Sequence, residues 1–173
     1  SGIQTGEVLW QARSKCPGLT VIHPNYELYM QCSTALMELL SQYSPLLERY
    51  SVDECFLDVT GSLGKRTPMD LALEISQRVR EELGFTVNIG ISNNKLLAKM
   101  GSELEKPNKV HTIFPHEIST KLWPLPVKEL FMVGRRTAPK LHRLNIFSIG
   151  QLAHADPGFL LDHFKSFGKM LWR

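Results

Sequence analysis

The stretch YSVDECFLDVT, residues 50–60, decides how this chain is interpreted, because it places two neighbouring carboxylates in a run of β-prone residues. Neighbours in a regular strand point to opposite faces, so either Asp53 or Glu54 would face the core. A buried, unpaired carboxylate costs several kcal/mol. Salt bridges, a strand end open on both sides, or a divalent cation would each avoid that cost. A cation bound by oxygen ligands alone would be magnesium or manganese.

Before this stretch, helical and β-prone patterns alternate. Residues 7–15 predict a short helix, and residues 19–23 predict a short strand closed by a proline. Asn25 then resembles a helix cap, and apolar residues recur at helical spacing as far as Tyr43.

After this stretch, Thr67 and the following proline predict a helix start, and Gly84 predicts its end. Residues 85–92 and 110–114 predict strands on either side of another helix. Such alternation predicts an α/β or α+β sandwich. Residues 116–173 carry only short helical patterns broken by Pro and Gly, so we place a domain boundary near residue 115.

A second signal is GISNNKLLAK, residues 90–99, in which a predicted strand leads through a polar turn into a helix. Helix N-termini attract phosphate, and Lys95, Lys99 and Lys106 add mobile positive charge. An ordinary capped helix with a solvated face would also explain this pattern.

A third signal is LFMVGRRTAPKLHRLNI, residues 130–146, where a glycine-containing turn precedes a basic helix. This layout predicts a helix-hairpin-helix that grips backbone phosphates without reading bases. Two helices of a small bundle are the alternative, and Gly168 predicts a second such hairpin. The predicted DNA-contacting residues of the first hairpin are Gly134, Arg135, Arg136 and Lys140.

Composition excludes several classes of protein. The 173 residues include 20 Lys and Arg against 17 Asp and Glu, a formal net charge of +3, which tolerates nucleic acid without requiring it. No apolar run is long enough for a transmembrane helix, so no membrane partner is expected. The three cysteines form no C-x-x-C pair, which disfavours a disulfide framework and favours the reducing cytoplasm.

Together these segments resemble the Y-family, or translesion, DNA polymerases, in particular the bacterial DinB-like polymerase IV group. Residues 50–60 are similar to that family's S-I-D-E-A-F-L-D-V-T palm motif, and residues 90–99 to G-I-S-x-N-K-x-L-A-K. Residues 106–108 resemble K-P-N-G, and residues 127–146 resemble the thumb hairpin. Residues 2–6 look like the end of the fingers.

The resemblance implies an α+β fold: a partial palm with a mostly antiparallel sheet, helices packed on it and its first strand missing, followed by an all-α helix-hairpin-helix thumb. Residues 1–24 would be a remnant of the fingers and 25–115 the palm. Residues 116–173 would be a thumb truncated at its C-terminus. We therefore expect a piece of a longer protein.

The resemblance also implies a function: Mg²⁺-dependent, template-directed DNA synthesis past damage. Asp53 and Glu54 would be the catalytic metal ligands, and Lys106 would contact the triphosphate. The partners would be primer–template DNA and deoxynucleoside triphosphates, with a sliding clamp for the longer parent. A further metal-binding aspartate lies on a strand that is absent here, so we expect the fragment to be inactive and its exposed sheet edge to permit self-association.

Two positions depart from the family pattern. Lys109 replaces the glycine of K-P-N-G, and Met132 replaces the first hairpin glycine, which puts close phosphate approach there in doubt. A non-enzymatic helix-hairpin-helix DNA-binding protein is the main alternative, with the acid pair merely structural. A nucleotide cyclase-like palm is another.

Overall fold

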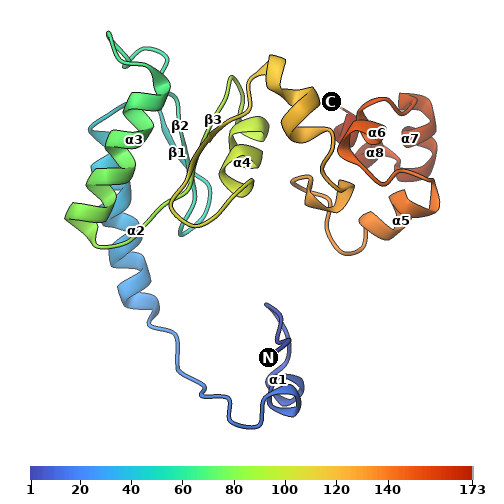
Figure 1. The fold of residues 1–173 in the computed structure, drawn as a ribbon, viewed down its shortest axis with the longest axis horizontal. Coiled ribbons are helices and arrows are strands. Elements are labelled where there is room, and N and C mark those ends of the chain that lie inside the picture. The colour runs from blue at the N-terminus through green and yellow to red at the C-terminus, as the bar shows by residue number, and fades with distance from the viewer. Residues whose placement is uncertain (173) are drawn as a thin grey trace.

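The computed structural model describes residues 1–172. Figure 1 shows a mixed central part with a C-terminal group of helices to its right and the N-terminal segment below. An extended connection leads from the first helix to the central part. The helices are α1 (Leu9–Lys15), α2 (Tyr26–Ser41), α3 (Pro68–Arg78), α4 (Lys95–Glu103), α5 (Ala138–Arg143), α6 (Ile149–Ala153), α7 (Pro157–Phe164) and α8 (Ser166–Trp172). The strands are β1 (Leu47–Arg49), β2 (Cys55–Leu57), β3 (Ile89–Ile91) and β4 (Val110–Thr112).

Local capping explains where the central helices begin and end. The Asn25 side chain accepts a hydrogen bond from the backbone N–H of Leu28 at 3.0 Å, as predicted for the start of α2. Thr67 forms a reciprocal capping box with Asp70 at the start of α3. A π-helical turn extends α3 to Gly84, whose φ of 76° is the left-handed conformation that glycine adopts freely.

The strand predicted for residues 19–23 is wrong, because this segment has no regular secondary structure. Ile22 is 83% exposed, and none of the strands within residues 1–172 pairs with this segment. A β-prone run forms a strand only when a partner satisfies its backbone. Among the described helices, none is long and apolar enough to cross a lipid bilayer.

The predicted α+β class is confirmed, but the predicted mostly antiparallel sheet is corrected. The described strands form two separate pairs: β1 and β2 are antiparallel, whereas β3 and β4 are parallel. The parallel pairing follows from the connection, because α4 crosses from the end of β3 to the start of β4.

The central core lies between helices α2 and α3 and the two strand pairs. Buried Leu39, Leu71 and Val79 form its centre, and Ile89 of β3 packs against them. The opposite face of β3 carries Gly90, where an added Cβ would lie 1.8 Å from the carbonyl oxygen of Ala98 in α4. Alternation along β3 therefore lets helices cover both of its faces.

The C-terminal helices form a second core around Val127, Leu141, Leu152 and Leu160. A third cluster joins α4 to residues beyond the predicted domain boundary, because Leu97 packs with Ile149. The division near residue 115 therefore stays a prediction.

The second hairpin predicted at Gly168 is wrong. Gly168 lies inside α8, and an added Cβ would meet the carbonyl oxygen of Leu160 at 2.1 Å. The turn itself is made by Lys165, with a φ of 57°. This glycine allows α7 and α8 to pack closely and does not form a loop.

Candidate active site

The acid pair lies at the turn that joins β1 to β2. The backbone N–H groups of Tyr50 and Ser51 both donate to the carbonyl oxygen of Glu54, at 2.9 and 3.0 Å, and close the turn. Asp53 is exposed and accepts a hydrogen bond of 2.8 Å from the Ser51 hydroxyl. Asp53 therefore avoids burial because it lies in an open turn at the end of a strand.

Glu54 avoids an unpaired charge in a different way, by forming a salt bridge. Its carboxylate pairs with the ammonium group of Lys99, which reaches across from α4. The Lys99 side chain is only 13% exposed and also contacts Glu103, one helical turn further on, at 3.0 Å. The ammonium group of this largely buried side chain is thus shared between two carboxylates.

The ionic contacts continue from Glu103 to Lys106, whose ammonium nitrogen lies 2.6 Å from the Glu103 carboxylate. We call these four residues, Glu54, Lys99, Glu103 and Lys106, the ion-pair network. It brings together two of the predicted site residues, Glu54 and Lys106. Glu103 was not predicted, although its spacing of four residues from Lys99 on one helix was a usable signal.

The ion-pair network shifts the pKa values of Lys99 and Glu103. Burial would lower the pKa of Lys99, but hydrogen bonds to Glu54 and Glu103 outweigh burial and raise it. Burial would raise the pKa of Glu103, but ion pairs with Lys106 and Lys99 outweigh burial and lower it. Both groups are therefore firmly charged near neutral pH.

The donor set of Asp53 and Glu54 suits a hard divalent cation, since it offers only carboxylate oxygens. The Lys99 ammonium already stands beside Glu54 as a positive charge, which shows that this carboxylate accepts a cation as partner. Within residues 1–172, no group of three or more His, Cys, Asp or Glu side chains could hold a metal ion. Asp53 and Glu54 would therefore supply only part of a coordination shell.

The start of α4 is fixed to the same hairpin. Asn94 caps the helix by accepting from the N–H of Leu97 at 2.8 Å. Lys95 pairs with Glu48 of β1 and lies 5.7 Å from the ring centre of Phe56. These contacts leave Lys95 less free for phosphate than the sequence predicted.

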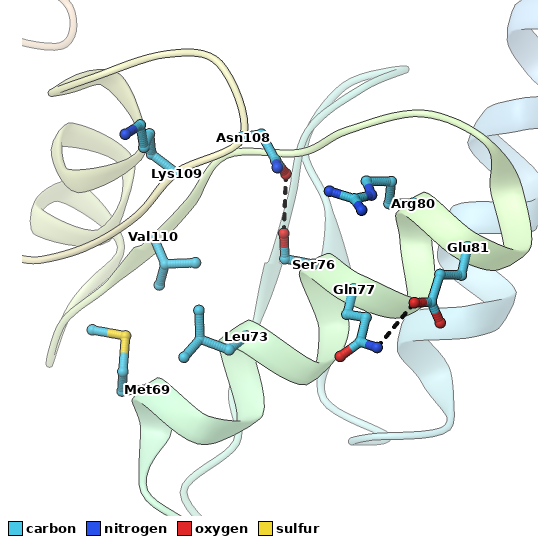
Figure 2. A pocket seen from close by; sticks show the side chains of 9 residues that line it. All are labelled: Met69, Leu73, Ser76, Gln77, Arg80, Glu81, Asn108, Lys109 and Val110. Atoms are coloured by element: carbon cyan, nitrogen blue, oxygen red, sulfur yellow. Dashed lines mark hydrogen bonds between the residues drawn. The ribbon is translucent and has the colours of Figure 1, made fainter.

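The segment after Lys106 turns to the other side of the sheet. Asn108, with a φ of 56°, accepts a hydrogen bond of 3.2 Å from Ser76 of α3. This segment forms a pocket of about 490 Å³ with α3, and Figure 2 shows Leu73 and Val110 among the side chains that line it. Lys109 lies outside the left-handed region, so its position does not require the glycine of the family pattern. Neither Asp53 nor Glu54 lines this cavity.

The predicted DNA-contacting hairpin lies between a short 3₁₀ turn (Val127–Glu129) and α5. Met132 has a φ of 75° and a side chain that is 54% exposed, so it holds the left-handed position where the family has glycine. Gly134 lies outside the left-handed region, and its carbonyl oxygen accepts from the N–H of Ala138 at 3.1 Å.

The basic residues of this hairpin differ in their contacts. Arg135 donates to the carbonyl oxygen of Thr5 at 3.1 Å and so ties the N-terminal segment to the hairpin. Arg136 and Lys140 are exposed, as Arg135 is. Because Arg135 already donates to Thr5, Arg136 and Lys140 are better placed to meet a phosphate.

Two family models match the chain. The model described as the impB/mucB/samB family covers residues 1–103, and the one described as the IMS family HHH motif covers residues 115–146. The chain belongs to the impB/mucB/samB family. The second match covers the hairpin residues described above.

Relatives of this impB/mucB/samB chain include DNA polymerase IV of Clostridium acetobutylicum, 51% identical over 171 residues that make up 99% of this chain and 43% of that protein. DNA polymerase IV of Acetivibrio thermocellus is 39% identical over 98% of this chain and 43% of its own length. The chain thus spans less than half the length of these curated relatives.

Solved structures agree with this family membership. The crystal structure of DinB from Sulfolobus solfataricus has a TM-score of 0.87 and 26% identity, covering 99% of this chain and 51% of that one. An insertion ternary complex of Dbh DNA polymerase has a TM-score of 0.86 and 27% identity, covering 98% of this chain and 50% of that one. The resemblance to the DinB-like Y-family polymerases is confirmed.

Proposed function

We propose that this chain is the palm and thumb part of a DNA-directed DNA polymerase that copies templates past damage. The observation that carries the proposal is the ion-pair network, which links Glu54 on the hairpin to Lys106 through two intermediate charges. The family resemblance implies a metal ligand for Glu54 and a triphosphate contact for Lys106, and these two groups must lie close together in nucleotidyl transfer. The relatives named DNA polymerase IV support the same activity.

In this proposal each residue has a defined task. Asp53 and Glu54 hold Mg²⁺, which when bound neutralises charge on the attacking and leaving oxygens. Lys106, half exposed, binds a phosphate of the incoming nucleotide. Arg136 and Lys140 neutralise phosphates of primer–template DNA. Because two carboxylates fill only part of a magnesium shell, we expect no primer extension by the 173-residue chain alone.

The test is primer extension by a longer protein that contains this chain. Asp53→Ala and Glu54→Ala should each lower the rate at least about a hundredfold. Glu48→Gln is the matched control, since Glu48 lies on the same hairpin and pairs with Lys95. Undiminished extension by both alanine variants would reject the assignment and favour a non-enzymatic DNA-binding protein. Template-independent conversion of triphosphates would favour the cyclase-like alternative.

We also propose that copies of this chain associate through strand edges. The two strand pairs leave ladder positions without a neighbouring strand, which supports this idea. Sedimentation should show dimers at high concentration, and a strictly monomeric chain would count against association. A sliding clamp stays a predicted partner of a longer protein.

A further inference from the structure

We propose that Lys99 is an exchangeable internal cation: it neutralises Glu54 when no divalent ion is bound, and passes to Glu103 when one binds. This inference rests on the proposed function, because it assumes that Glu54 is a metal ligand. It adds a positioning role for Lys99 that the sequence patterns did not assign.

The burial of Lys99 explains why it needs a partner at all times. Only 13% of its side chain is exposed, so its ammonium group has lost part of its hydration, and neighbouring carboxylates compensate for that loss. Two are in contact, one on the hairpin and one on its own helix. If a metal ion binds Glu54, the contact with Glu103 therefore still neutralises the charge of Lys99.

The geometry makes this exchange possible without a backbone movement. Glu103 lies four residues after Lys99 on α4, and the two charged groups are already 3.0 Å apart. Side chains at this spacing are neighbours on a helix surface. Lys99 needs only to loosen its contact with Glu54, because its second contact already exists.

The other lysines near the site cannot take this role. Lys95 is held by Glu48 and by the ring of Phe56. Lys106 contacts Glu103 at 2.6 Å and therefore competes with Lys99 for the same carboxylate. If Lys106 binds an anionic phosphate, it no longer competes with Lys99 for Glu103. Lys99 can then pair with Glu103 alone, which frees the Glu54 carboxylate for a divalent ion.

The consequence is a competition between Lys99 and a divalent ion for Glu54. Mn²⁺ binding to the 173-residue chain, followed by electron paramagnetic resonance at low salt, measures this competition directly. Lys99→Met should tighten Mn²⁺ binding about fivefold, because Glu54 no longer gives up an ion pair. Lys99→Arg should leave the affinity close to that of the unaltered chain.

Lys95→Met is the matched control, since it removes the same charge from the same helix but from a lysine paired with Glu48. It should change the affinity less than about twofold. Equal gains in the two methionine variants would show a general charge effect and overturn the proposal. The exchange would also be overturned if Lys99→Met still tightened Mn²⁺ binding in a chain that carries Glu54→Gln.

A second arm remains informative if Lys99→Met fails to fold. Glu103→Gln removes the receiving carboxylate, ties Lys99 to Glu54 and should weaken Mn²⁺ binding about threefold. Glu105→Gln, which removes a carboxylate paired with Lys109, is its control and should have little effect. Unchanged or tighter binding in Glu103→Gln would reject the exchange.

These outcomes are distinct from those that test the proposed function. A Lys99 effect on Mn²⁺ binding without primer extension by the longer protein would reject the polymerase and keep the exchange. Primer extension that depends on Asp53 and Glu54, together with Mn²⁺ binding that Lys99→Met does not change, would support the polymerase and reject the exchange.

Discussion

The rings of Tyr50 and Phe131 meet edge to face with their centroids 6.0 Å apart, and they join the acid-bearing hairpin to the predicted DNA-contacting hairpin. Phe131 also donates its backbone N–H to the sulfur of Met100 in α4 at 3.3 Å. The segment that leads into the DNA-contacting hairpin is therefore packed against both elements of the candidate active site. The predicted phosphate contacts and the predicted metal ligands are therefore held in a fixed arrangement.

Replacement of Phe131 tests this connection. Phe131→Ala should lower the free energy of unfolding by about 2 kcal/mol, because it removes an aromatic pair and part of the third cluster. Urea unfolding measures the change. Phe147→Ala, at an exposed ring in the same part of the chain, should have less than half that effect. Equal losses would mean that the Tyr50 contact contributes nothing specific.

Gly90 should tolerate no side chain. Gly90→Ala would place a methyl group 1.8 Å from a backbone oxygen of α4, which must move away from β3. We expect a loss of at least about 3 kcal/mol in the free energy of unfolding. Gly61→Ala, where nothing lies within 4 Å of the added Cβ, is the control and should be nearly neutral. A thermal melt of Gly90→Ala that matches the unaltered chain would contradict the packing described for α4.

Met132→Gly should stabilise the chain and strengthen DNA binding together. Glycine relieves the left-handed strain at φ 75°, a gain of about 0.5–1 kcal/mol after its own entropy loss. It also removes an exposed side chain from the predicted approach of a phosphate. Thermal melting and fluorescence anisotropy with duplex DNA measure the two effects. Weaker DNA binding would show that Met132 itself contacts the duplex.

DNA binding by this chain should depend strongly on salt. Arg136→Ala and Lys140→Ala should each reduce the slope of log affinity against log salt by about 1, measured between about 50 and about 200 mM salt. Lys65→Ala removes an exposed charge from the loop before α3 and should leave the slope unchanged. Equal reductions in all three variants would indicate binding by overall charge alone.

Short-range features of the sequence predicted much of the fold. The start of α2 at Asn25, the capping box at Thr67 and the end of the α3 segment at Gly84 all agree with the structure. Each depends on hydrogen bonds or backbone angles within a few residues, so the local sequence is sufficient. Motif order likewise indicated the family that the comparisons show.

The ladder partners and the packing of Gly168 could not be predicted in this way. The run at residues 19–23 and the strand at residues 89–91 look alike locally, yet only the second has a neighbouring strand. Gly168 resembles a turn residue by itself, but its role depends on Leu160 in the preceding helix. Strand pairing and the packing of Gly168 both depend on contacts between segments that are separate in the sequence.

By itself, then, the sequence determined the starts of α2 and α3, the end of the α3 segment and the family, because these follow from neighbouring residues. Only the tertiary structure decided that Lys99, 45 residues from Glu54, would neutralise it. Burial of the apolar faces of α2, α3 and α4 brings these distant charges together. At Lys99, the ion pairs with Glu54 and Glu103 outweigh the cost of burial and raise its pKa.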